Sequence, residues 1–188
     1  MQLLDDGTII FSASDMSVAA KCEWAVMRRL DHKLGRLDSA PPKDESAMLN
    51  RTAVLGNAHE EQILEGLETE FGAAVRVERP DPTNTADDWR TAMAAVTHQT
   101  QAALTDGSPL IFQAAFFDGA FQGFADFIVR SGMSVDGRPE YEVFDTKLAR
   151  RAKITALLQL AAYVDQLEEE WDSFGPRSSP HPRNRREE

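Results

Sequence analysis

Three consecutive strand-like runs, at residues 110–117, 121–130 and 140–146, constrain the fold of this chain more than any other feature. Apolar side chains alternate along the first two runs, as they do in strands with a buried face. Asp118-Gly119 lies between these two runs and favours a tight hairpin turn, and Asp136-Gly137 lies in the second connection. We therefore predict three neighbouring strands, of which the first two form a hairpin.

Helical sequence surrounds these strands. Apolar residues recur at helical spacing in four segments, residues 15–30, 48–69, 86–105 and 152–171. Two shorter segments have strand-like composition, residues 8–11 and 71–77. Ser14 is a suitable N-cap for the first helix, and the charge of Asp15 suits its first turn. Together these elements predict an α/β chain.

The composition excludes several classes of protein. A chain of 188 residues that is 42% hydrophobic can build one core, and its net charge of −11 argues against general coating of nucleic acid. That charge is compatible with a nuclease, because bound cations offset the acids of a metal site. Cys22 is the only cysteine, which excludes a disulfide within the chain and favours a cytoplasmic setting. We find no signal peptide and no membrane span, and expect no membrane partner.

Residues 175–188 differ from the rest, because they are rich in proline, serine and arginine and lack apolar periodicity. Such a segment cannot bury enough surface to offset its ordering entropy, so we predict a disordered tail after a single domain at 1–174. A basic arm that contacts phosphates is the alternative.

Two acids and a lysine, each at or near the end of a strand-like run, are candidates for metal-dependent phosphodiester chemistry. Asp126 shares a strand face with Phe124 and Ile128, which we expect to point inward, and an inward acid is costly unless a cation satisfies it. The alternative is an exposed acid at a strand end. Asp145 and Lys147 are two residues apart, so on one strand they point to the same side.

In this arrangement Asp145 can bind a metal ion while the ammonium group of Lys147 faces the phosphate. A surface ion pair is the alternative for Asp145 and Lys147. Glu142 is expected to point to the other face, toward solvent.

His59 follows Gly56 and Ala58 on a predicted helix, where the slim neighbouring surface leaves room for a bulky group. A neutral imidazole there can add a nitrogen ligand and favours manganese slightly over magnesium. Glu60 is the alternative ligand. A structural or simply exposed histidine is the other alternative.

Polar residues on and before the last predicted helix can support such a site. Gln159 and Tyr163 are four residues apart and share a helix face, where they can hydrogen-bond site carboxylates or a phosphate. A polar edge beside the core is the alternative. Arg150 and Arg151 add positive charge for phosphate contact, and a solvated basic cap explains them equally well.

Taken in order, these residues resemble the RecB-like branch of the PD-(D/E)XK nuclease superfamily, over roughly residues 12–170. The motif residues are Gly56 and His59, Gly123 and Asp126, Asp145 and Lys147, and Gln159 and Tyr163. The opening segment, residues 12–16 with Cys22, is also similar to the N-terminus of these nucleases.

The resemblance implies a restriction-endonuclease-like core, a mixed sheet flanked by helices, and a nuclease that cuts DNA in repair, recombination or defence. It implies that His59, Asp126, Asp145 and the main-chain carbonyl of Thr146 bind magnesium or manganese. It further implies that Lys147 orients or activates the attacking water. Gln159 and Tyr163 would support the site or the DNA.

Two departures from the family shape these expectations. AddB-type and CRISPR-associated relatives hold an iron–sulfur cluster with four cysteines, and with Cys22 alone we expect no cluster here. Many relatives are fused to helicase or further nuclease modules, and no strand-like run follows the last predicted helix. We therefore expect the N-terminal nuclease portion of a longer protein without the last core strand. The alternatives are a catalytically silent module that binds DNA or a partner, and a structural α/β fragment.

Overall fold

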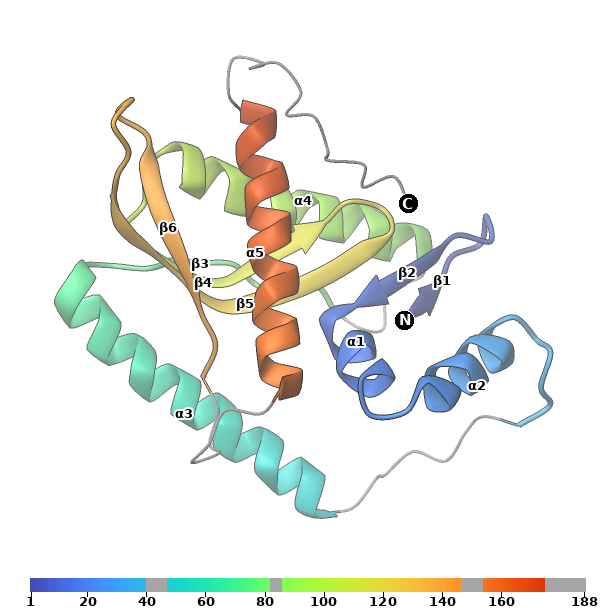
Figure 1. Ribbon diagram of the computed structural model, residues 1–188. Coiled ribbons are helices and arrows are strands. Elements are labelled where there is room, and N and C mark those ends of the chain that lie inside the picture. Colours follow the sequence, from blue (N-terminus) through green and yellow to red (C-terminus); the bar gives the residue numbers. More distant parts are fainter. Residues whose placement is uncertain (40–46, 82–85, 147–153, 175–188) are drawn as a thin grey trace, which may run out of the picture.

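The computed structural model describes residues 1–39, 47–81, 86–146 and 154–174, with side chains except at 47–54, 86–87 and 170–174. In these residues a curled mixed sheet is flanked by helices, which confirms the α/β prediction (Figure 1). The predicted tail at 175–188 lies outside the described residues. None of the helices described is both long and apolar enough to cross a membrane.

The centre of the sheet is the predicted hairpin. Strands β4 (Leu110–Phe117) and β5 (Phe121–Met133) are antiparallel, and β6 (Pro139–Phe144) pairs antiparallel with the second half of β5. Asp118 closes the turn, because its Oδ1 accepts the backbone N–H groups of Ala120 and Phe121 at 2.7 and 2.6 Å. Gly119 has a φ of +92°, a conformation that glycine adopts without strain.

Three short strands complete the sheet. β1 (Gln2–Leu3) pairs antiparallel with β2 (Ile9–Ser12), β2 pairs parallel with the start of β5, and β3 (Val75–Arg76) pairs parallel with β4. β2 and β6 therefore lie on the same edge of β5 and run toward each other along it. On β5, the pairing with β2 ends at Gln122 and the pairing with β6 starts at Phe127. No described strand therefore covers this edge of β5 between Gln122 and Phe127.

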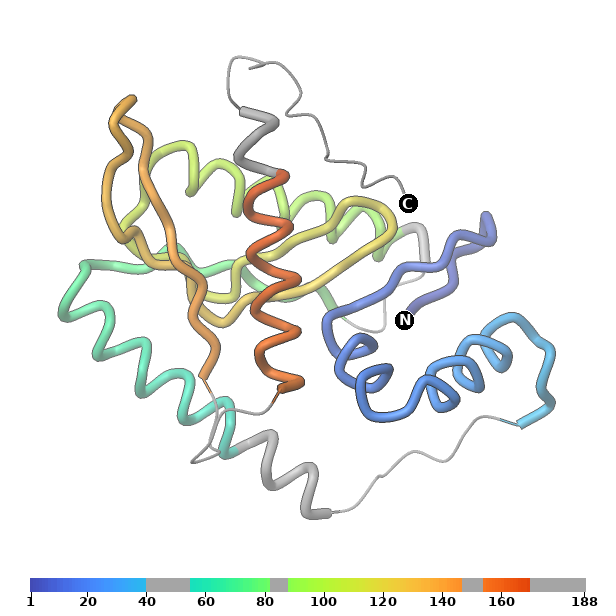
Figure 2. The backbone as a smooth tube through the Cα atoms, viewed as in Figure 1, coloured from blue at the N-terminus to red at the C-terminus, as the bar shows by residue number. Residues whose placement is uncertain are grey.

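The described residues form the helices α1 (Ala13–Ala19), α2 (Glu23–Lys33), α3 (Ala47–Phe71), α4 (Ala86–Thr105) and α5 (Ile154–Phe174). The helices α1, α3, α4 and α5 contact the strands, whereas the main contacts of α2 are with α1. Leu64 of α3 packs into a core cluster with Phe112 and Phe127. The larger cluster joins α4 and α5 to the sheet, through residues such as Met93 and Tyr163. Figure 2 shows α5 crossing the sheet, with β6 on one side of the helix and β2–α1 on the other.

The first helix differs from the prediction. The single helix expected at 15–30 is two helices, because the backbone at Cys22 is extended (φ −163°, ψ 101°) and caps α2. Ser12, not Ser14, is the N-cap of α1, since Ser12 and Asp15 form a reciprocal capping box. The strand expected at 71–77 is shorter than predicted, because α3 continues to Phe71 before β3 begins.

Candidate functional site

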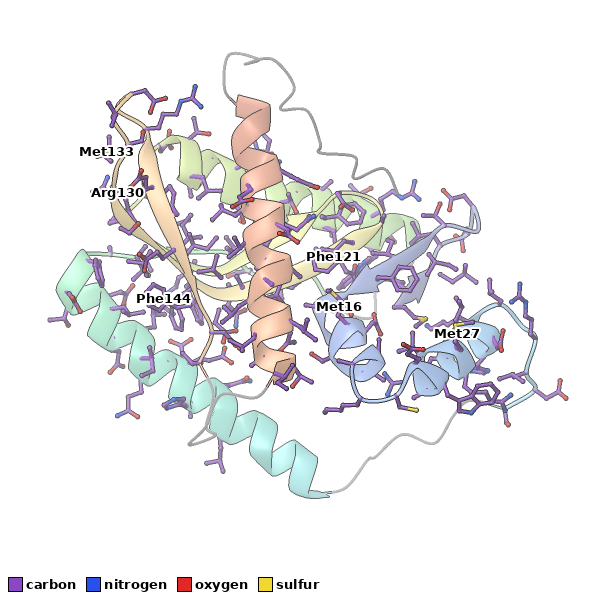
Figure 3. The ribbon with its side chains drawn as sticks, in the orientation of Figure 1. Met16, Met27, Phe121, Arg130, Met133 and Phe144 are labelled. Atoms are coloured by element: carbon purple, nitrogen blue, oxygen red, sulfur yellow. The ribbon has the colours of Figure 1, made fainter. Side chains whose placement is uncertain are left out.

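A cleft of about 270 Å³ opens where β2 and β6 end against the uncovered edge of β5. Where two strands end next to each other at a sheet edge, the residues there are not covered by a neighbouring strand, so a crevice can form that is open to solvent. Ligand sites of open α/β sheets lie in such crevices. In Figure 3, α5 crosses between Phe144 at the end of β6 and Phe121 at the start of β5. The residues that line the cleft are Ser12, Ala13, Ser14, Arg79, Gln122, Gly123, Phe124, Asp126, Asp145, Gln159 and Tyr163.

Two predicted acids, Asp126 and Asp145, share this cleft, and both are half-buried. The backbone N–H of Thr146 donates to Asp126 Oδ2 at 2.9 Å, which ties the end of β6 to β5. Asp145 was expected within the strand, but β6 ends at Phe144 and Asp145 follows it directly. Lys147, Arg150 and Arg151 lie outside the described residues. Glu142 is exposed, as predicted from its place on the other strand face.

The expected inward face of β5 is only partly inward. Ile128 is fully buried, whereas Phe124 and Asp126 are half-buried. The neighbouring Phe127, which points to the opposite face, is also fully buried against the α3 cluster. Both faces of the sheet are therefore covered at this end, and the cleft is what keeps Asp126 accessible.

Gln159 and Tyr163 of α5 lie on one face, as predicted, and both line the cleft. The Tyr163 ring stacks on Phe116, with centroids 6.0 Å apart, and only 8% of Tyr163 is exposed. Burial, together with the negative charge of nearby Asp126, raises the pKa of Tyr163 to about 12. The phenol is therefore neutral at physiological pH and can act as a hydrogen-bonding group.

The β2–α1 corner forms the opposite wall. Asp15 Oδ2 accepts hydrogen bonds from the Ser12 backbone N–H at 3.0 Å and from the Ser12 hydroxyl at 2.6 Å. It also accepts a hydrogen bond from the Met1 ammonium. Burial by itself raises the pKa of Asp15, and these hydrogen bonds outweigh that effect, so its pKa lies below the ordinary 3.8. Asp15 thus fixes Ser12 at the rim of the cleft. On β5, Gln122 is fixed by Trp89 Nε1, which donates to its Oε1 at 2.7 Å.

Arg79 is a cleft residue that the sequence reasoning missed. Its Nε donates to Gln113 Oε1 at 2.9 Å, and its Cζ lies 5.0 Å from the centroid of the Phe124 ring. Gln113 Nε2 in turn donates to Glu60 Oε2 at 3.3 Å. In the sequence, the only indication was a cation shortly after a strand-like segment and before Pro80, which is too weak to single it out.

His59 is not brought to this cleft. It lies on α3 in a shallow hollow with Gln62 and Gly66, and its neighbour Glu60 is linked toward the cleft through Gln113. Within the described part of the chain, no three His, Cys, Asp or Glu side chains group closely enough to hold a metal ion. The donors that do meet, Asp126 and Asp145, offer oxygen atoms, the ligand type that magnesium and manganese prefer.

No protein-family model, curated protein or solved structure matches this chain. The site therefore has to be judged by its own geometry. That geometry brings together four of the predicted residues, one acid on β5, one acid directly after β6, and a glutamine and a tyrosine from one helix, and adds Arg79 to them.

Proposed function

We propose that this chain is a metal-dependent nuclease that hydrolyses phosphodiester bonds in DNA, as an exonuclease of repair, recombination or defence. The observation that carries the proposal is the meeting of Asp126 and Asp145 in one cleft, although Asp126 lies on β5 and Asp145 directly follows β6. Two half-buried carboxylates in one cleft repel each other, and a shared divalent cation removes that cost.

Four residues of the cleft, and the two residues that follow Asp145 in the sequence, have a role in this proposal. Asp126 and Asp145, with the main-chain carbonyl of Thr146, would hold magnesium or manganese, which when bound polarises a phosphate and acidifies water. Asp126 is oriented for this role by the Thr146 N–H. Lys147 would stabilise negative charge that develops on the phosphate. Gln159 and the neutral Tyr163 would hydrogen-bond the strand or the carboxylates.

The test is cleavage of labelled single- and double-stranded DNA with manganese, magnesium or EDTA. Asp126→Asn and Asp145→Asn are expected to lower metal-dependent cutting by at least about a hundredfold, since each removes a charged ligand. Lys147→Ala is expected to abolish it as well. Glu142→Gln is the matched control, because it neutralises an exposed acid of β6, three residues before Asp145, that does not line the cleft.

Two further variants test the two predicted ligands, His59 and Glu60, that do not line the cleft. If His59 binds the metal, His59→Ala weakens manganese binding measured by calorimetry; if Glu60 does so, Glu60→Gln has this effect instead. A folded native chain that binds manganese but does not cut DNA would indicate the silent module. Cutting that survives Asp126→Asn would show that the activity arises elsewhere.

A further inference from the structure

Arg79 is a cation in the cleft without an acidic partner among the described residues. The contrast with Arg76, three residues earlier, is informative. Arg76 lies over the Phe112 ring at 5.8 Å and pairs with Glu61 at 3.2 Å and Glu68 at 3.6 Å, so its charge is neutralised on the surface. Arg79 lies over an aromatic ring too, but no carboxylate of the described chain neutralises it.

The contacts that hold Arg79 are uncharged and leave its outer edge available. Gln113 takes the Nε hydrogen, and Phe124 covers one face of the guanidinium. The two terminal nitrogens, Nη1 and Nη2, are therefore not used by either contact. A guanidinium held by Nε and by one face is fixed in orientation, and such a planar fork matches the oxygen atoms of a phosphate.

The backbone of Gln113 has an unusual conformation that places its side chain against Arg79. Gln113 has a φ of +56°, the one left-handed residue other than glycine in the described chain. Its position in the register lies opposite Asp126, where the pairing of β4 with β5 is interrupted. A left-handed conformation is unfavourable for a residue other than glycine, so it persists where the surroundings require it. Here the bend places the Gln113 amide between Glu60 and Arg79.

The charge of the cleft completes the argument. Asp126 and Asp145 disfavour the approach of an anion, and the chain as a whole has a net charge of −11. An arginine that lines the same cleft as these acids, yet is held by an amide and a ring, supplies local positive charge where a phosphate has to enter.

We propose that Arg79 binds a phosphate group of the DNA strand through its two terminal nitrogens and so positions the strand over Asp126 and Asp145. This inference rests on the proposed function and adds how the substrate is held. Gln113 acts as the positioning residue for Arg79.

The test separates binding from cutting. Binding of a short fluorescein-labelled oligothymidylate is measured by anisotropy in calcium, across a series of salt concentrations, for the native chain, Arg79→Ala, Arg79→Lys and Arg76→Ala. We expect Arg79→Ala to weaken binding about tenfold and to lower the slope of log K against log salt by about 0.7, the value for one lost contact to a single strand. The affinity of Arg79→Lys should lie between those of the native chain and Arg79→Ala, because lysine keeps the positive charge but lacks the planar fork of the guanidinium.

Arg76→Ala is the matched control and should bind like the native chain. Native-like affinity and salt slope in Arg79→Ala would overturn the inference, and so would an equal loss in Arg76→Ala. Binding that depends on Arg79 without any cutting would leave the inference standing and refute the nuclease. Metal-dependent cutting, with no effect of Arg79→Ala on binding, would support the nuclease and overturn the inference about Arg79. An Arg79 effect seen only with a 5′-phosphorylated strand would assign the contact to an end phosphate, and an equal effect on a 5′-hydroxyl strand to an internal one.

Discussion

Adding a single methyl group at Gly123 should disturb the packing of Tyr163 at the cleft. A Cβ atom at Gly123 would lie 2.5 Å from Tyr163 Cε1 and 3.3 Å from Phe121 Cε1. Carbon atoms in contact are normally about 3.5–4.0 Å apart, so the methyl group of Gly123→Ala overlaps the tyrosine ring by about 1 Å. The ring has no room to retreat, because it stacks on Phe116 and is almost fully buried.

The magnitude follows from the cost of overpacking. Forcing a methyl group into a packed core costs about 1–3 kcal/mol of unfolding free energy. Alanine offsets about 0.5–1 kcal/mol of this cost, because it loses less backbone entropy on folding than glycine does. We expect Gly123→Ala to lower the free energy of unfolding by about 1–2 kcal/mol. For a chain of this size that corresponds to a fall in Tm of about 2–8 °C, measured by circular dichroism during heating.

Two comparisons isolate the contact with Tyr163. Gly66→Ala is the control, because Gly66 lies in α3 with nothing within 4 Å of its added Cβ, so alanine there should raise stability by about 0.5–1 kcal/mol. In a Tyr163→Ala background the cost of Gly123→Ala should shrink by about 1 kcal/mol, as a double-mutant cycle reports for residues in contact. A Tm of Gly123→Ala equal to or above that of the native chain would refute the reasoning.

Two further predictions concern titration and capping. Burial raises the pKa of both tyrosines of the chain, Tyr141 and Tyr163, to about 12, so neither phenolate should form near pH 10 while the protein is folded. Because the unfolded chain releases these protons near pH 10, stability should fall as the pH rises from about 10 to about 12; phenolate absorbance rising with a midpoint near 10 in folded protein would contradict this. Asp15→Ala should cost about 1–2 kcal/mol in urea unfolding at neutral pH, because it leaves the Ser12 N–H without its cap. The lowered pKa of Asp15 means that its contribution is present above pH 3.8 and lost as the pH falls below it, so the difference between the two proteins should disappear in acid, and a constant difference would argue against the carboxylate.

Local patterns in the sequence were sufficient for most elements. The helix at 86–105 and the strand at 110–117 have the predicted limits, because a helical period, a closing Asp106-Gly107 and a hairpin turn are all short-range features. Gln159 and Tyr163 could be placed on one helix face for the same reason. The break between α1 and α2 was missed, since residues 20–22 contain neither glycine nor proline and the helical spacing continues across them.

The sequence by itself determined that this chain builds strands and helices with two acids near strand ends. Only the tertiary structure decided that Ser12, Asp126 and Asp145 share one cleft, because β2 and β6 meet on one edge of β5 although more than a hundred residues separate them in the chain. It also decided that Arg79 belongs to the site and that His59 lies elsewhere. Periodicity reports which face of an element is buried, whereas the place where separate elements end together is set by sheet pairing over long distances in sequence.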